Sequence, residues 1–464
     1  MDANAVLLVI MFITFVGLLF TGYPVAFVLG GVGFVFTAIS VVCQRLFDVE
    51  TGLDFRTLSL VVERTYALMD NGLLVALPMF IYMGLMLDRS GIAERLMHSM
   101  QELFGSLRGG LAITVTMIGV ILAASTGIIG ASVVLLGLIS VPAMLKQGYS
   151  KELSVGVVCG AGCLGILIPP SIMLVIMADQ LVLSVGHLFM GAVFPGLILA
   201  ALYVGYIIIY CLLKPDAAPL AQNRRNLSIK VVWGVFGAII PPVLLIVLVL
   251  GSIFFGYATP TEASGVGAFG ACLLALLNRK LSYPVLKQVI RDTLKTTAFI
   301  FAILVGATCF SLAVRGLGGD DLIEHSLANL PFPPMVVLSI VLGIVFLLGF
   351  FLDWIEITMI ILPLVVPVIL KLEFEINGFG KLQNPEVIWF TVLVAVTLQT
   401  SFLTPPVGFA LFYLKGVCPP EIKVGHIYRG VIPFITLQLI GLAIIVIWPE
   451  LVTWLPAVSY STTP

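Results

Sequence analysis

Two apolar stretches of the chain contain paired prolines, and these stretches hold residues that could bind ions and an anion. The first runs from Gly165 to Ser171 around Pro169-Pro170, and the second runs from Thr400 to Gly408 around Pro405-Pro406. Because proline has no backbone N–H, each pair interrupts a helix and frees the carbonyl oxygens before it. Unwound carbonyls in a membrane coordinate Na⁺, and the N-terminus of the half-helix that follows favours an anion.

Two other apolar stretches have polar residues in their middle rather than at their ends. In 109–145 these are Ser125-Thr126-Gly127 and Gly130-Ala131-Ser132, and in 333–370 they are Asp353 and Glu356. We interpret both stretches as re-entrant hairpins with tips deep in a membrane, where small residues permit a tight turn. Charges at that depth are costly and point to function. For the first hairpin, close helix packing by small residues is the alternative.

These four stretches supply the candidate site residues, and no catalytic residue is predicted. The Na⁺ candidates are Ser125, Ser132, Gly165, Ile166, Pro169, Asp353, Thr358, Thr400 and Thr404. The substrate candidates are Ser171, Asp179, Gly130, Ser132, Pro405 and Gly408. Glu262, which follows Thr259-Pro260-Thr261, has two interpretations: a functional carboxylate, or an acidic residue in the first turn of a helix.

Other chemistries lack their usual patterns. The four histidines are scattered and the seven cysteines do not pair by spacing, so neither a transition-metal site nor a disulfide framework is predicted. The Walker A pattern is absent, so we expect no nucleotide. The oxygen groups at the two proline breaks lead us to expect two or more Na⁺ ions instead. The net charge of −1 excludes a nucleic-acid partner.

The composition requires a membrane around these residues. The chain has 464 residues, of which 60% are hydrophobic and 10% charged, whereas a soluble domain has about 25% charged residues. The mean hydropathy is +1.17. The apolar runs are continuous rather than alternating, which excludes a transmembrane barrel. The N-terminus has Asp2 and no basic segment, so we expect a retained first span rather than a signal peptide.

Basic residues set the orientation. If both hairpins re-enter, the inner loops are 88–108, 146–151, 214–230, 279–295 and 415–429, and they hold 17 of the 23 basic residues. Both termini are then periplasmic. The remaining expected elements are spans near 4–42 (broken at Gly22-Tyr23-Pro24), 73–88, 190–213, 231–257, 261–278, 296–314 and 430–455, interrupted helices over 152–183 and 388–415, and a polar outer segment over 43–71.

The two halves of the chain are related. Pro24 and Pro260 stand 236 residues apart, as do Pro169 and Pro405, and the orientation inverts one half relative to the other. Inverted repeats are typical of secondary transporters. We therefore predict an all-α polytopic membrane protein with two re-entrant hairpins and two interrupted helices. Scaffold spans are expected over 1–108, 184–332 and 416–464, and a transport domain over 109–183 and 333–415.

The motifs together resemble a known family. GIIGASVVLLGLISVPAMLKQGY, LGILIPPSI, ATPTEASGVG and SFLTPPVGFALFYL are similar to the large membrane subunit (DctM-like) of tripartite ATP-independent periplasmic (TRAP) transporters, over essentially the whole chain. The resemblance implies Na⁺-driven import of a small organic acid across the bacterial inner membrane by an elevator mechanism. It also implies two partners, a periplasmic binding protein and a small four-helix membrane subunit, which we expect to be a separate chain.

One position departs from that family. Many members have Gly-Thr-Leu-Gly before the first proline pair, where this chain has Gly162-Cys163-Leu164-Gly165, and cysteine is a poorer ligand for a hard cation.

On the outer side, Arg315 and Lys371 are expected to contact the binding protein. The alternatives are a stand-alone Na⁺/anion symporter of related fold, and an intramembrane enzyme that uses Asp353 and Glu356. The enzyme lacks an evident nucleophile or metal.

Overall fold

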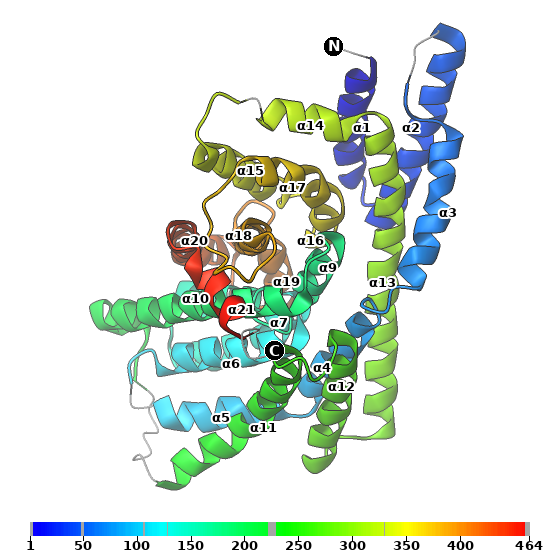
Figure 1. Cartoon of the computed structure of the whole chain (residues 1–464). Helices are drawn as coiled ribbons and strands as arrows, with labels where there is room; N and C mark the ends of the chain where they lie inside the picture. Colours follow the sequence, from blue (N-terminus) through cyan, green and yellow to red (C-terminus); the bar gives the residue numbers. More distant parts are fainter. Residues whose placement is uncertain are drawn as a thin grey trace.

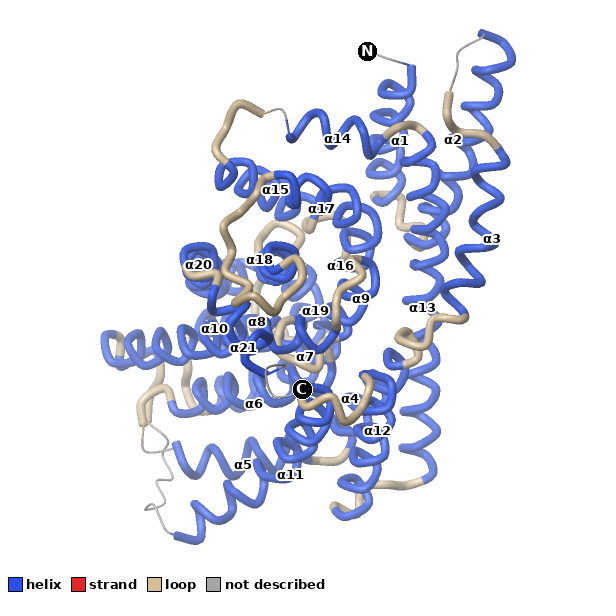
Figure 2. Tube along the Cα trace, in the orientation of Figure 1, coloured by secondary structure: helices blue, strands red, loops and turns tan. Residues whose placement is uncertain are grey.

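The computed structural model describes residues 3–47, 51–104, 107–127, 129–220, 229–328 and 330–459, and every regular element in them is helical (Figure 2). The elements are α1 (Ala3–Leu19), α2 (Val25–Phe47), α3 (Phe55–Met69), α4 (Ala76–Arg89), α5 (Ile92–Phe104), α6 (Gly110–Thr126), α7 (Ile129–Lys146), α8 (Lys151–Cys163), η1 (Leu164–Ile166), α9 (Ile172–Gln180), α10 (Val185–Leu213), η2 (Pro215–Ala217), α11 (Ile229–Phe254), α12 (Pro260–Leu277), α13 (Tyr283–Gly316), α14 (Gly319–Ala328), α15 (Pro334–Leu348), α16 (Trp354–Glu356), η3 (Ile357–Ile361, a π-helical turn), α17 (Leu362–Lys371), α18 (Pro385–Leu403), α19 (Phe409–Val417), α20 (Val424–Ile447) and α21 (Glu450–Ser459).

The predicted fold class is confirmed. Nine helices in the described residues are long and apolar enough to cross a membrane. The first hairpin is α6–α7 and the second is α15 followed by α16, η3 and α17. The interrupted helices are α8–η1–α9 and α18–α19. Both breaks fall at the predicted proline pairs, so the related sequences of the two halves fold into related elements.

Helix α18 lies at the centre of one group of helices. Every residue from Val387 to Leu403 is buried, and α18 packs against α15, α17, α19, α20, α10 and α21. In Figure 1 it is seen end-on, with the other helices of this group around it. A helix that is covered on all sides can carry polar residues without exposing them to lipid.

A second group of helices is built around α13, which is 34 residues long. It packs along α2, α3 and α4, and α4 packs against α12 (Figure 1). The contact between α2 and α13 is made by small residues. A Cβ atom placed on Gly306 would lie 2.3 Å from the Ala26 carbonyl oxygen, so the two backbones touch at this point.

Three segments that were predicted as a polar outer segment or as inner loops contain helix in the structure. The predicted outer segment 43–71 contains α3, which Asp54 caps by accepting a hydrogen bond from the Thr57 N–H at 2.7 Å. That bond lowers the pKa of Asp54 below its ordinary value. The predicted inner loop 88–108 contains α5, and α13 begins at Tyr283 within the predicted loop 279–295.

Helices α10 and α20 pack with the interrupted helices rather than with the group around α13. A Cβ atom on Gly196 of α10 would lie 2.8 Å from Ile168 at the first break. A Cβ atom on Gly156 of α8 would lie 2.1 Å from the Gly430 carbonyl oxygen of α20. The indole N–H of Trp389 donates to the Ile445 carbonyl at 3.0 Å, which joins α18 to α20.

The α2–α13 contact gives a test of the packing. Gly306→Ala should lower the free energy of unfolding by about 1–3 kcal/mol, since the added methyl group must push the Ala26 backbone away. Gly205→Ala on α10 is the matched control, because a Cβ atom there meets nothing within 4 Å. Thermal unfolding of the purified protein in detergent measures both. Equal melting temperatures for the two variants would contradict the close contact.

Candidate functional site

The first break lies between α8 and α9. After the 3₁₀ turn η1, the N–H groups of Leu167 and Ile168 donate to the Leu164 carbonyl at 3.1 and 3.0 Å. Ser171 is the N-cap of α9: its hydroxyl donates to the Ile166 carbonyl at 2.5 Å and accepts from the Leu174 N–H at 3.4 Å. The predicted substrate residue Ser171 therefore bridges the break, and one lone pair of the predicted ligand Ile166 is used within the chain.

The second break lies between α18 and α19. Thr404 ends α18 in an extended conformation, and Gly408 begins α19 with a φ of +42°. The hydroxyl of Thr404 donates to the Thr400 carbonyl at 2.7 Å, and that of Thr400 donates to the Val396 carbonyl at 2.8 Å. Both hydroxyl hydrogens are therefore committed to backbone, and the oxygen lone pairs are left to accept a hydrogen bond or bind a cation.

The tip of the first hairpin lies against the half-helices that follow the two breaks. Gly127 has a φ of +59°, and a Cβ atom there would lie 3.1 Å from the Ile172 backbone nitrogen in the first turn of α9. A Cβ atom on Gly130 would lie 3.2 Å from the ring of Tyr413 in α19. The structure thus brings the predicted substrate residue Gly130 next to α19, in the second interrupted helix.

The tip of the second hairpin lies against α18. A Cβ atom on Gly349 would lie 2.3 Å from the Ser401 hydroxyl. The Asp353 carboxylate accepts from the Trp354 N–H at 2.8 Å and caps α16, and the Thr358 hydroxyl donates to the Trp354 carbonyl at 2.7 Å. Glu356 is 1% exposed, and its Oε2 has no hydrogen-bond partner in the described residues. In the same part of the chain, the amide nitrogen and the amide oxygen of Gln399 also have no hydrogen-bond partner.

The remaining predicted residues lie in different places. Ser132 is buried in α7. Ser125 is in the last turn of α6, but its side chain is outside the described residues. Asp179 lies at the far end of α9, about 12 Å along the helix from the first break. Glu262 forms a reciprocal capping box with Thr259, which is the first-turn interpretation.

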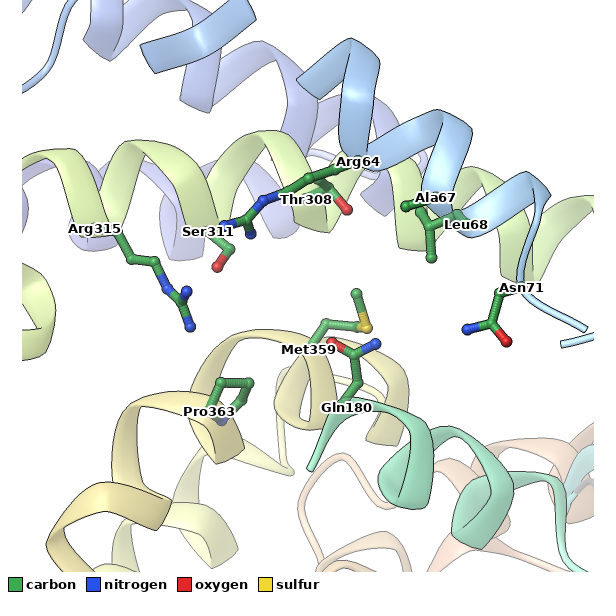
Figure 3. Close-up of a pocket in the computed structure, with 10 residues that line it drawn as sticks. All are labelled: Arg64, Ala67, Leu68, Asn71, Gln180, Thr308, Ser311, Arg315, Met359 and Pro363. Carbon is green, nitrogen blue, oxygen red and sulfur yellow. The ribbon is translucent and has the colours of Figure 1, made fainter. Parts of the chain in front are cut away.

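A pocket of about 300 Å³ lies beyond Asp179, between the two groups of helices. Figure 3 shows Arg64 of α3 and Arg315 of α13 reaching into it from one side, and Gln180, Met359 and Pro363 facing them. From the sequence, Arg64 is not expected at a pocket, because 43–71 is predicted as a polar outer segment. The signal was present in Asp54, which is a favourable N-cap residue before the helix.

The outer cations expected to meet a partner are paired with acids from α14. Lys371 forms a salt bridge with Glu324, which lowers the pKa of Glu324. The Arg315 Nε lies 3.6 Å from the Asp320 carboxylate. These two positions therefore present less free positive charge than the sequence alone predicts.

The two breaks and the two hairpin tips bring oxygen groups and helix ends together. No cluster of three or more histidine, cysteine, aspartate or glutamate side chains that could hold a metal ion occurs among the described residues. Carbonyl and hydroxyl oxygens from two breaks, closed in by two hairpin tips, are suited to a hard monovalent cation and a small anion.

Two known transport proteins are similar over long stretches. The C4-dicarboxylate TRAP transporter large permease protein DctM of Vibrio cholerae is 28% identical, and the alignment covers 96% of this chain and 97% of that protein. The isethionate TRAP transporter permease protein DctMQ of Oleidesulfovibrio alaskensis is also 28% identical. That alignment covers 86% of this chain and 59% of the longer protein.

A solved structure has the same fold. The YdaH transporter of Alcanivorax borkumensis, described as having an unusual topology, superposes with a TM-score of 0.58 at 12% identity, covering 84% of this chain and 87% of that one. The family model of the DctM component of tripartite ATP-independent periplasmic transporters matches residues 12–451. This multi-pass membrane protein therefore belongs to the DctM family of TRAP transporter large permeases, which carry out transport rather than catalysis and work with a small membrane subunit and a periplasmic binding protein.

Proposed function

We propose that the chain imports a small organic anion together with Na⁺ across the bacterial inner membrane, in complex with a periplasmic binding protein and a separate small membrane subunit. One observation carries the proposal: two interrupted helices, each with carbonyl or hydroxyl oxygens at its break, are closed in by two hairpin tips. The related proteins named for C4-dicarboxylates and isethionate support an anionic substrate. The distribution of basic residues supports periplasmic termini.

The Na⁺ sites are proposed at the two breaks. Around the first break the ligands are the carbonyls of Gly165, Ile166 and Pro169 with the hydroxyls of Ser125 and Ser132. Around the second they are Thr358, Thr400, Thr404 and Asp353. The hydrogen bonds that Thr358, Thr400 and Thr404 donate to carbonyls four residues earlier support this, because they fix each hydroxyl with its lone pairs directed away from the helix backbone. Cys163, buried at the end of α8, contributes at most its carbonyl.

The anion is proposed to lie near the N-termini of α9 and α19. Ser171 and Gly408 are the N-cap residues of these half-helices, and each helix end presents backbone N–H groups and a positive dipole. Gly130 of the first hairpin tip lies close to the ring of Tyr413, so a side chain at position 130 would crowd this side of the site. With the cations nearby, binding of the anion and of Na⁺ would be mutually favourable, which is the basis of coupling.

An elevator movement of a body larger than 109–183 and 333–415 is proposed. Because α10 and α20 touch the first break and α8 through glycines, we include them with α21 in the moving body. The group of helices around α13 would then be the scaffold. If the interrupted helices moved alone, the contacts of Gly196 with Ile168 and of Gly156 with Gly430 would be broken.

Transport should depend on the binding protein. In proteoliposomes that contain the chain with its small subunit, uptake of a labelled small acid should require the cognate binding protein outside and a Na⁺ gradient directed inward. The measurement is initial uptake with each component omitted in turn. Equal uptake without the binding protein would favour a stand-alone symporter, and equal uptake without Na⁺ would refute the coupling.

Thr404→Val should raise the Na⁺ concentration needed for half-maximal uptake by about tenfold, since it removes an oxygen ligand while keeping the side-chain volume. Ser132→Ala should act in the same direction at the other site. Thr391→Val is the matched control: its buried hydroxyl makes the same kind of bond, to the Val387 carbonyl at 2.6 Å, but it lies 13 residues before Thr404. If Ser125→Ala, Ser132→Ala and Thr404→Val together leave the Na⁺ dependence unchanged, the assigned ligands are wrong.

Single cysteines at positions 132 and 404 should change their accessibility together. In a background without the seven native cysteines, both should switch sides toward a membrane-impermeant thiol reagent when Na⁺ and substrate are added. A cysteine at exposed Ser59 of α3 should react from outside in both conditions. Independent responses at 132 and 404 would instead indicate local gating at each hairpin.

A further inference from the structure

The pocket between the two groups of helices contains two cations that the proposed ion and anion sites do not use. Arg64 projects from α3 and Arg315 from α13, and both line the pocket together with Ser311 (Figure 3). No acidic residue is among the ten described residues that line it. Its volume of about 300 Å³ is at the lower end of the range for small-molecule sites.

The arginine end of this pocket carries an excess of positive charge. Within the described part of the chain, the half-buried Arg64 has no hydrogen-bond partner and no ion pair. Nearby, the charge of Arg315 repels that of Arg64, and the charge of Asp320 attracts it. Asp320 lies 3.6 Å from Arg315, so one carboxylate faces two guanidinium groups. Two like charges held together in a partly buried pocket favour an anion between them.

The opposite end of the pocket is held by hydrogen bonds within the chain. The Asn71 amide donates to Asp179 at 2.6 Å and the Gln180 amide donates to the same carboxylate at 3.0 Å. Both carboxylate oxygens of Asp179 are therefore engaged in hydrogen bonds at this end of the pocket. Met359 and Pro363 provide an apolar wall between the two ends.

We propose that Arg64 and Arg315 bind an acidic group, a carboxylate or a sulfonate, of the transported anion while it lies between the two groups of helices. The planar guanidinium fork matches the oxygen geometry of both groups. The inference rests on the proposed function for the identity of the ligand. It adds that residues of the proposed scaffold, and not only those of the moving body, contact the substrate and select for its charge.

Binding of two probes to the purified complex of the chain and its small subunit tests the site. Succinate and 2-hydroxyethanesulfonate are titrated at fixed Na⁺ without binding protein, and the apparent Kd is taken from the shift in melting temperature and from calorimetry. Arg64→Gln and Arg315→Gln should each weaken the binding of at least one probe about tenfold or more. Arg64→Lys keeps the charge but not the fork and should lie between the wild type and Arg64→Gln.

The control is Arg56→Gln, an exposed arginine in the first turn of the same helix α3 that does not line the pocket. It should bind both probes like the wild type. Unchanged affinity in Arg64→Gln and Arg315→Gln overturns the proposal. The proposal is also overturned if neither probe binds to the wild type at tens of millimolar. It is likewise overturned if the variants lose docking of the binding protein but still bind the acids like the wild type.

The outcomes separate this inference from the proposed function. If acid binding depends on the two arginines but the wild type performs no uptake in proteoliposomes, the proposed transport activity fails and the anion site stands. If uptake is normal in Arg64→Gln and Arg315→Gln and their affinities match the wild type, the transport activity stands and the arginine site is wrong.

Discussion

A backbone polar group in the middle of a membrane must find a partner or be enclosed by protein, and the fold is organised around that requirement. Two helices end at paired prolines, which have no N–H to continue the helical hydrogen bonds. The hairpin tips cover these ends: Gly127 lies against the first turn of α9, and Gly349 lies against Ser401 of α18. Helix α18 is consequently buried along nearly its whole length. In the proposed elevator movement, the covering elements would move with the breaks, because separating them would expose backbone polar groups to lipid.

The same requirement explains the side chains near the breaks. Threonine hydroxyls in α18 donate to carbonyls one turn earlier, which satisfies each O–H without a partner from another helix. Their oxygens still have lone pairs, so a residue that is structurally satisfied can also be a ligand. Gln399 and Glu356 differ, since in the described residues they keep buried atoms without partners. Such groups are costly to bury, and in a transporter that cost is acceptable where a ligand or a second conformation satisfies them.

The breaks and hairpins, which prolines or polar residues mark inside apolar runs, could be predicted from the sequence. The helices that mix charged and apolar residues could not. Paired prolines in apolar runs located both breaks, and polar residues inside apolar runs located both hairpins. Helices α3 and α5 were expected as loops because Arg56, Glu63, Arg64 and Glu94 resemble solvated sequence, although each helix has one apolar face. Which helices pack with α8 and α18 depends on contacts such as Gly156 with Gly430, and a single sequence does not contain that information.

The arginine pocket shows why such a feature depends on tertiary structure. Arg64 and Arg315 are about 250 positions apart, and only the packing of α3 along α13 brings them together. Opposite them, the Asn71–Asp179 hydrogen bond joins the loop before α4 to the end of α9, so it links the proposed scaffold to the proposed moving body. A displacement of α9 must break that bond and widen or close the pocket at the same time. Any anion held by the arginines would therefore be sensitive to the position of the moving body, and the body's equilibrium would respond equally to the anion.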